Sequence, residues 1–239
     1  TDVLQALDQA IAAQDAFRSA LQQRGSAIME QCKANGTYAM ILASRPYQND
    51  DLVNHDLPKM FTEYGIPVLT ADSLPEIHTE DLSNLLLDVV NNFHARMLST
   101  ALVAARSSYL EYAQIVNFNC GHDAYLSDEI VRVMDEVGGK APLVLKVDES
   151  DIVGPLRIRV RSFVETVNMR RARLAAQTAA VSDDSAPVSE RASHELAAPY
   201  HSKFVKDMIQ AKTVLVPNTS HAFSMLMAAA FAGQGLTTV

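Results

Sequence analysis

Apolar residues recur every three or four positions in the first part of the chain, from Leu4 to Ile28. This spacing is typical of an amphipathic helix and predicts one long helix over residues 2–33. Asp2 is a suitable N-cap for this helix, and Gly36 is a suitable residue to end it. Beyond Gly36 the pattern changes to short apolar runs that alternate with amphipathic stretches.

Each short apolar run ends in a polar loop, and its length is that of a buried strand rather than of a helix. The predicted strands cover residues 38–43, 66–69, 112–118, 143–147 and 212–217. Helical spacing between the strands predicts helices over residues 52–65, 79–108, 127–137 and 153–180. Thr79 and Ser127 are the expected starts of the second and third of these helices. The second is long enough for a bend near Ser99 and Thr100.

The alternation of strands and helices predicts an α/β fold, a parallel sheet with helices on both faces. The long N-terminal helix occupies residues 1–35, and the α/β domain occupies residues 36–180. A stretch rich in Ser, Asp and Pro predicts a linker over residues 181–211. Residues 212–239 form a C-terminal strand–helix extension, the start of a following α/β section. Since no closing element follows, we expect a section of a longer protein.

The composition of the chain disfavours nucleic acid and membranes as binding partners. The chain is 48% hydrophobic and has a formal net charge of −8. An acidic chain is poorly suited to nucleic acid or to an anionic membrane surface, which basic patches bind. No apolar run approaches the ~18 residues of a membrane span. The two cysteines are too few for a disulfide framework, so a reducing cytoplasm is the expected location.

The polar loops that follow the predicted strands should meet at one edge of the sheet, where open α/β sheets bind their ligands. The loops begin near Ser44, Ala71, Cys120, Asp148 and Asn218. They predict a common crevice whose candidate residues are Arg45, Tyr47, His55, Asp72, Cys120, His122, Asp123 and Asp148.

Cys120 has the widest choice of chemistry among these residues. It can be a nucleophile beside His122, a metal ligand, or only a small loop residue. Adjacent side chains rarely face one another, which disfavours the nucleophile–base pair. A metal site needs more ligands, and the other cysteine, Cys32, is expected to be a semi-buried residue in the last turn of the first helix. The usual dinucleotide, P-loop, zincin and hydrolase motifs do not occur in the sequence.

The predicted helix after Val153 is rich in arginine. Arg157 and Arg161 share a face by their i, i+4 spacing and can bind a phosphate or a carboxylate. Asp148, Glu149 and Asp151 lie just before the helix, and pairing with these acidic residues is the reading we favour.

Two spaced blocks of sequence carry a resemblance to a known family. The first contains Ser44–Tyr47, Asn54 with His55, and Gly65–Ser73. The second contains Asn117–Ala124, Leu145–Glu149 and Arg157–Phe163, and Thr213–Asn218 extends it. Both blocks resemble the large multidomain CoA-substrate-specific enzyme activases of the 2-hydroxyglutaryl-CoA dehydratase activator type. Within that type, the similar section is the one related to the iron–sulfur subunits of the dehydratase.

The resemblance implies an anaerobic system in which ATP hydrolysis drives an electron to low potential, for dehydration of a 2-hydroxyacyl-CoA. It implies that Cys120 is one ligand of a [4Fe–4S] cluster in the intact protein. The other ligands would lie upstream, so the cluster is expected to be absent from this chain alone. In that role Gly121 allows close backbone approach, and Arg45 and Arg157 contact a CoA phosphate or a partner domain.

The implied partners are other domains of the same polypeptide and a dehydratase component, and a homo-oligomer is a further option. The chain departs from the family pattern at Gln48, where many members carry histidine, and it lacks the ATPase motifs. We therefore expect no activity from this chain alone. The alternative hypothesis is a metal-free structural or protein-interaction α/β domain of the same large protein.

Overall fold

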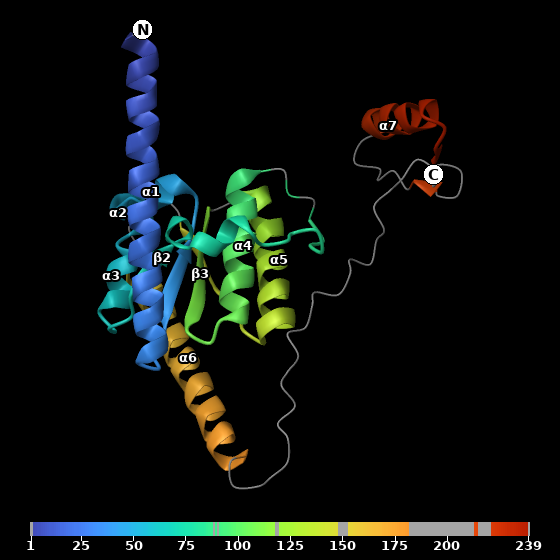
Figure 1. The fold of residues 1–239 in the computed structure, drawn as a ribbon. Helices are drawn as coiled ribbons and strands as arrows, with labels where there is room; N and C mark the ends of the chain where they lie inside the picture. The colour runs from blue at the N-terminus through green and yellow to red at the C-terminus, as the bar shows by residue number, and fades with distance from the viewer. Residues whose placement is uncertain are drawn as a thin grey trace. The chain divides into compact units, whose positions relative to one another are not determined.

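A computed structural model of the 239-residue chain describes residues 2–87, 89, 91–117, 120–147, 153–181, 213–214 and 221–238. The chain forms two compact units, Thr1–Ala198 and Pro199–Val239. The first unit contains a four-stranded sheet with helices on both faces (Figure 1). The predicted α/β class is therefore confirmed, together with the long N-terminal helix.

The sheet is parallel throughout, and its strands stand in the order β2-β1-β3-β4. The strands are β1 (Ala39–Ala43), β2 (Val68–Thr70), β3 (Leu110–Asn117) and β4 (Leu143–Val147). Ile41 pairs with Leu69 on one side and with Tyr112 on the other. Strands β1 and β3 are buried almost throughout, which is why their sequences are nearly continuous apolar runs.

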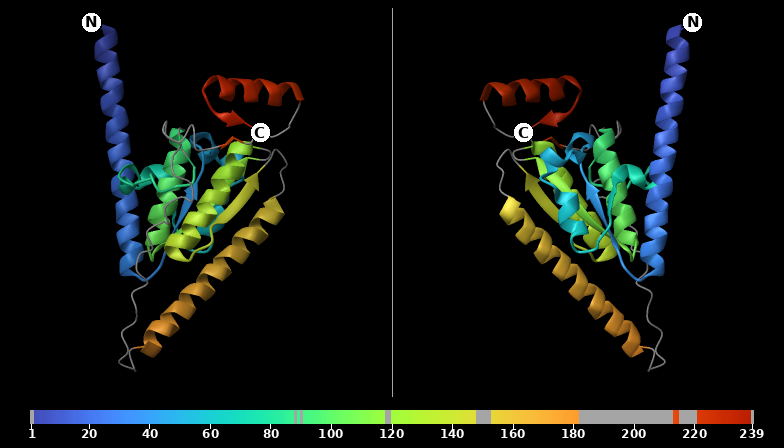
Figure 2. Two further views of the ribbon diagram at one scale, coloured as in Figure 1. Left: turned by 90° about the vertical axis from the view of Figure 1, so that its right-hand side faces the viewer. Right: turned by 90° about the vertical axis from the view of Figure 1, so that its left-hand side faces the viewer.

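Helices join the strands, and short 3-10 turns extend two of the connections. The helices of this unit are α1 (Asp2–Ala34), α2 (Asp51–Asn54), α3 (Leu57–Thr62), α4 (Asn92–Arg106), α5 (Gly121–Gly138) and α6 (Val153–Val181). The 3-10 turns are η1 (Pro46–Asn49), η2 (Ala71–Ser73) and η3 (Pro75–His78). Helices α1 and α6 lie on opposite sides of the sheet (Figure 2).

Two hydrophobic cores share the sheet, because successive residues of a strand point to opposite faces. In the first core, the even-numbered β3 residues Leu110 and Tyr112 pack against α1, α4 and α5. In the second core, Ala113 and Ile115 pack against α3 and α6. Strand β1 contributes to both cores in the same alternating way.

The helix predicted from Thr79 to Ser108 is wrong in its first half. Helix α4 begins at Asn92, because the Asn91 side chain accepts hydrogen bonds from the backbone N–H groups of Phe93 and His94. The preceding leucines are not helical, and the backbone N–H of Leu86 donates to Glu129 on α5 instead. No break occurs at Ser99 or Thr100 within α4.

Two other predicted helices have different bounds in the structure. The helix predicted over residues 52–65 is divided into α2 and α3, because His55 and Asp56 adopt left-handed backbone conformations between them. The helix predicted to begin at Ser127 begins at Gly121, with Cys120 as its N-cap residue. Ser127 lies inside α5, where its hydroxyl donates to the Asp123 carbonyl.

The second unit contains β5 (Thr213–Val214), α7 (His221–Gly233) and β6 (Thr237–Thr238), and the two strands pair in parallel. This agrees with the predicted strand–helix extension. The linker predicted over residues 181–211 lies outside the described residues, apart from Val181 at the end of α6. Within the part of the chain that is described, no helix is both long and apolar enough to cross a bilayer.

Candidate functional site

The carboxyl ends of β1 and β3 form the point of the sheet where the chain direction divides. From β1 the chain leaves through α2 and α3 on the second-core face, and from β3 it leaves through α5 on the first-core face. Neighbouring strands that diverge in this way form the topological switch point at which open α/β sheets bind ligands. Arg45 follows β1 here, and Cys120 follows β3.

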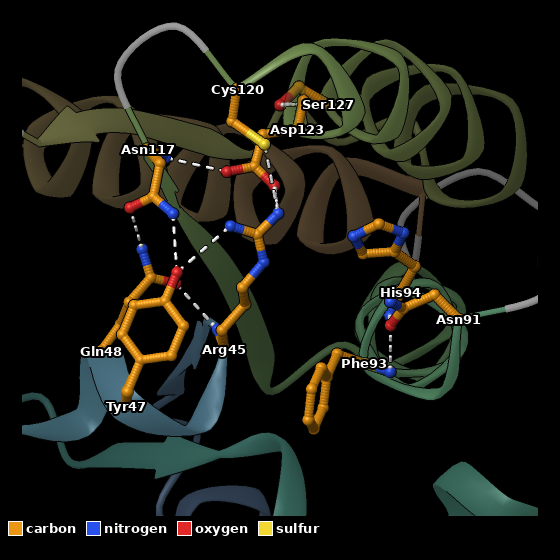
Figure 3. A network of polar contacts seen from close by, with 10 residues as sticks. All are labelled: Arg45, Tyr47, Gln48, Asn91, Phe93, His94, Asn117, Cys120, Asp123 and Ser127. Atoms are coloured by element: carbon orange, nitrogen blue, oxygen red, sulfur yellow. Dashed lines mark hydrogen bonds and ion pairs between the residues drawn. The ribbon is translucent and has the colours of Figure 1, made fainter.

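The Arg45 guanidinium joins the two strand ends (Figure 3). Its Nη2 atom lies 2.6 Å from Asp123 Oδ1 and 3.3 Å from Cys120 Sγ. The other Asp123 oxygen accepts the backbone N–H of Asn117 at 2.8 Å. Burial lowers the pKa of Arg45, but hydrogen bonds to Cys120 and Tyr47 and the Asp123 charge outweigh it and keep this pKa above its ordinary value. The positively charged Arg45 guanidinium therefore links the loop after β1 to the residues that follow β3.

Cys120 is partly exposed and holds the N-cap position of α5. The hydrogen bond from Arg45, and then the nearby backbone N–H of Asp123, hold the pKa of the Cys120 thiol below its ordinary value. The Asp123 carboxylate opposes this effect through its negative charge. The surroundings therefore favour the thiolate, the form that acts as nucleophile or metal ligand.

A ring of neutral side chains holds Arg45 in place. Arg45 Nη1 donates to the Tyr47 hydroxyl oxygen at 3.2 Å, and Asn117 Nδ2 donates to the same oxygen at 2.7 Å. Gln48 Nε2 donates to Asn117 Oδ1 at 3.0 Å, while Gln48 Oε1 accepts the Arg45 backbone N–H at 2.8 Å. We refer to these residues together as the switch-point site: Arg45, Tyr47, Gln48, Asn117, Cys120 and Asp123.

Two histidines lie beside the switch-point site. The rings of His94, in the first turn of α4, and His122, in the first turn of α5, are 5.8 Å apart between centroids. The His94 ring points toward Arg45 in Figure 3. Burial, and then the positive charge of Arg45, hold the pKa of His94 below its ordinary value. His122 therefore contacts the His94 ring. The contacts that the structure describes for Cys120, the residue considered above as a nucleophile beside His122, are with Arg45 and Asp123.

The other candidates of the predicted crevice have different surroundings. Asp72 forms an ion pair with Arg96 of α4. His55 adopts the left-handed backbone conformation at the end of α2. Asp148, with the rest of the acidic loop of residues 148–152, lies outside the described residues.

Arg157 and Gly121 are the remaining residues expected to contact a cofactor or partner. Arg157 lies on α6 and pairs at 2.8 Å with Glu63, at the end of α3. Gly121 opens α5, and a Cβ atom added there would meet no heavy atom within 4 Å. The structure therefore brings Arg45 and Cys120 together, with Gly121 beside them, and Arg157 has its own partner.

The donor set of the switch-point site is too small for an iron–sulfur cluster, which normally takes four thiolates. Cys120 supplies one. Cys32 precedes β1, at the opposite edge of the parallel sheet, and is buried in the first core. Among the described residues, no group of three or more His, Cys, Asp and Glu side chains can hold a metal ion. The chain by itself does not fit a complete cluster.

Sequence reasoning missed three residues of this region: Gln48, Asn117 and His94. Gln48 stood out only as a departure from a family pattern, yet it is almost fully buried and bonds to both strand ends. Asn117 ends β3, and its polarity at the end of an apolar run was the available signal. His94 gave no signal because the helix predicted from Thr79 placed it far from the sheet edge.

Residues 1–74 match a family model described as CoA enzyme activase uncharacterised domain (DUF2229). The match includes the first of the two blocks that carry the resemblance, Ser44–Ser73, and ends before the second. No curated protein and no solved structure matches the chain. The match supports a CoA enzyme activase family.

Proposed function

We propose that this chain is a scaffold section of a 2-hydroxyacyl-CoA dehydratase activase, in which Cys120 is one thiolate ligand of an iron–sulfur cluster. The remaining ligands would come from outside this chain, from other domains of the same polypeptide. The observation that carries the proposal is the 3.3 Å contact between Arg45 Nη2 and Cys120 Sγ at the switch point. A thiol must lose its proton before it binds iron, and a fixed guanidinium favours that loss.

The surrounding contacts suit this role. The hydrogen-bonded ring of Tyr47, Gln48 and Asn117 fixes the Arg45 guanidinium before any ligand binds. Such support reduces the reorganisation that a ligand group needs when it binds. Electron transfer, a dehydratase component as partner and a cytoplasmic location all belong to this proposal. No reaction is assigned to the isolated chain.

Arg157 belongs to the proposal as a contact for a CoA phosphate or a partner domain. Its pair with Glu63 is about half exposed on both sides. Exposed pairs of this kind contribute little to stability, so a phosphate can replace the Glu63 carboxylate at low cost.

The second candidate function is a metal-free structural or interaction domain of the same large protein. Its supporting observation is that Arg45, Asp123 and Asn117 already satisfy one another across the strand ends. In that case Cys120 only completes the hydrogen bonding of Arg45, and the switch-point site is a brace between β1 and β3.

The first test measures the reactivity of Cys120 in the 239-residue chain as a function of pH. We expect Arg45→Met to slow alkylation by iodoacetamide near neutral pH and to move the pH profile upward, because the hydrogen bond that favours the thiolate is lost. Cys32 is 3% exposed, so it contributes little to the rate. Arg18→Met is the matched control, since Arg18 lies on the exposed part of α1. An unchanged profile for Arg45→Met would remove the basis of the proposal.

The second test measures iron. The chain purified anaerobically should lack a stoichiometric cluster, because it supplies a single thiolate at this edge of the sheet. In a longer protein that contains this section and further cysteines, Cys120→Ser should lower the iron and sulfide content. Unchanged iron there, with normal folding, would favour the metal-free domain.

A further inference from the structure

A cavity of about 270 Å³ lies at the amino-terminal edge of the sheet, opposite the edge that carries the switch-point site. One wall is the segment that joins α5 to β4, and the other is a single face of α6, because its residues follow i, i+3, i+4 and i+7 spacing. We call it the amino-edge cavity, and its described lining residues are Gly138, Gly139, Lys140, Arg170, Arg173, Leu174 and Gln177. These residues include three cations and no carboxylate, although the chain as a whole has a net charge of −8.

Two glycines at the end of α5 leave the amino-edge cavity open. Gly139 adopts the left-handed backbone conformation, with φ of 59°, and ends the helix. Gly138 packs so closely on α4 that an added Cβ would lie 2.2 Å from the Ala105 carbonyl oxygen. Neither glycine has a side chain that could fill the space beside α6.

The carbonyl groups at the nearby helix ends are already bonded and do not compete for a ligand. The Lys140 ammonium donates to the carbonyl oxygens of Ala104 and Leu110 at 2.8 Å each, and also to that of Ser107. The backbone N–H groups of Gly139 and Lys140 donate to carbonyl oxygens in the last turns of α5. Because these contacts use the three ammonium protons, Lys140 acts on the cavity as a fixed positive charge rather than as a donor.

The positive charges around the amino-edge cavity are only partly balanced. Arg170 forms an ion pair with Glu111 of β3, whose side chain is 1% exposed. Among the described residues, none forms an ion pair with Arg173. Burial lowers the pKa of Lys140 to about 8; the Glu111 carboxylate opposes this shift, and the positive charges of Arg170 and Arg171 add to it. An anion in the cavity would offset this repulsion.

We propose that the amino-edge cavity binds a small anion of the phosphate class, a diphosphate group, through the Arg170 and Arg173 guanidinium groups. The two arginines are three residues apart on α6, so their Cβ atoms are about 5–6 Å apart and both can bond one ligand. The pair with Glu111 leaves further N–H donors of Arg170 available, since a guanidinium has five.

Charge and size favour diphosphate over other anions. Three cations match an anion with two or more negative charges better than a single carboxylate, and the guanidinium fork matches phosphate oxygens. The cavity is smaller than the ~300–1,000 Å³ of sites for drug-sized ligands, so it suits the anionic group rather than a whole nucleotide. This proposal is independent of the role of Cys120, which lies at the opposite edge of the sheet.

Isothermal titration calorimetry of the full chain with inorganic diphosphate measures this binding, at low ionic strength because salt screens exposed charges. We expect saturable binding of one diphosphate per chain. Arg173→Met removes a contact, and Gln177→Glu adds a repelling charge. Each should raise the dissociation constant about tenfold or more. Arg24→Met and Gln5→Glu make the same charge changes at exposed positions of α1 and should leave binding unchanged. Circular dichroism checks that each variant keeps its fold.

Chemical modification of the parent chain locates the bound anion without any substitution. Diphosphate should protect Arg173 from phenylglyoxal, measured by mass spectrometry of peptides, and should leave Arg24 reactive. Titration with ADP identifies the source of the diphosphate group. Tighter binding of ADP than of inorganic diphosphate would indicate a nucleotide, and equal or weaker binding would indicate the free anion.

Four results would overturn the proposal of a diphosphate site. They are the absence of saturable binding, an unchanged dissociation constant for Arg173→Met, an equal loss of affinity for Arg173→Met and Arg24→Met, and tighter binding of succinate than of diphosphate. Equal protection of Arg24 and Arg173 from phenylglyoxal would also overturn it, because diphosphate would then act only on the general surface charge.

Discussion

Asp123 is the most buried charged group of the switch-point site, with a side chain that is 3% exposed. One carboxylate oxygen accepts from Arg45, and the other accepts the backbone N–H of Asn117. It therefore fixes both the guanidinium and the end of β3. Together with the contacts of Arg45 to Tyr47 and Gln48, this carboxylate sets the position of the guanidinium beside the Cys120 thiol.

Asp123→Asn should reduce the free energy of unfolding by about 3 kcal/mol, because removing one partner leaves the other charge of a buried pair uncompensated. The new amide also places a donor against either Arg45 or the Asn117 N–H. Urea denaturation followed by circular dichroism measures the loss. Asp128→Asn, at an exposed position five residues further along α5, should change stability by less than about 0.5 kcal/mol. Equal losses for the two variants would mean that the Arg45–Asp123 pair contributes nothing specific.

The residues of the switch-point site were predictable to different degrees. Arg45, Tyr47, Cys120 and Asp123 were predicted from the rule that loops after parallel strands meet at one edge. That rule does not say which loops lie beside each other, and strand order decides this. Because β1 and β3 are neighbours while β2 lies beyond β1, Arg45 meets Cys120 and Asp72 pairs elsewhere. Strand order depends on long-range packing, which local pattern does not encode.

Among the elements, strands were easier to predict than helix starts. A buried parallel strand is a short apolar run, so β1, β3 and β4 were found close to their observed bounds. Helix starts depend on competing caps. Thr79 and Asn91 both suit an N-cap, and the structure uses Asn91 because Glu129 takes up the Leu86 N–H in the segment between them. That choice depends on a contact 43 residues away in the sequence.

Gly25 is the residue that lets α1 lie close to the η2 turn. An added Cβ would come within 2.1 Å of the Ser73 carbonyl oxygen, which is a backbone atom of η2 and cannot move aside alone. Alanine is otherwise the better helix former by about 1 kcal/mol. We expect the clash to outweigh this preference, so that Gly25→Ala lowers the melting temperature and loosens the contact between α1 and η2.

Gly154→Ala is the matched control for Gly25→Ala. Gly154 lies in the first turn of α6, and a Cβ there meets no heavy atom within 4 Å. Alanine should therefore be neutral or slightly stabilising at this position. Thermal unfolding of both variants decides the point, and a Gly25→Ala protein as stable as the parent would show that α1 is not held closely at Ser73.

At the scale of the first unit, one sheet carries two cores. Strands β1 and β3 send alternate side chains to each face, so neither core can loosen without disturbing the strands that support the other. Leu145, on β4, is fully buried in the second core, and Cys32, on α1, is buried in the first. If the cores form one cooperative unit, a cavity in the second core should expose the thiol in the first.

Leu145→Ala should therefore lower the urea concentration at which Cys32 becomes reactive, although the two residues lie on opposite faces of the sheet. A buried Leu→Ala change costs about 2–5 kcal/mol, which corresponds to a midpoint shift of about 1 M urea or more. The measurement is thiol alkylation against urea in a Cys120→Ser background, with helical circular dichroism recorded in parallel. Leu52→Ala is the control, because Leu52 is 89% exposed and should leave both midpoints in place. A Leu145→Ala protein whose circular dichroism midpoint falls while Cys32 stays protected would mean that the two faces unfold separately.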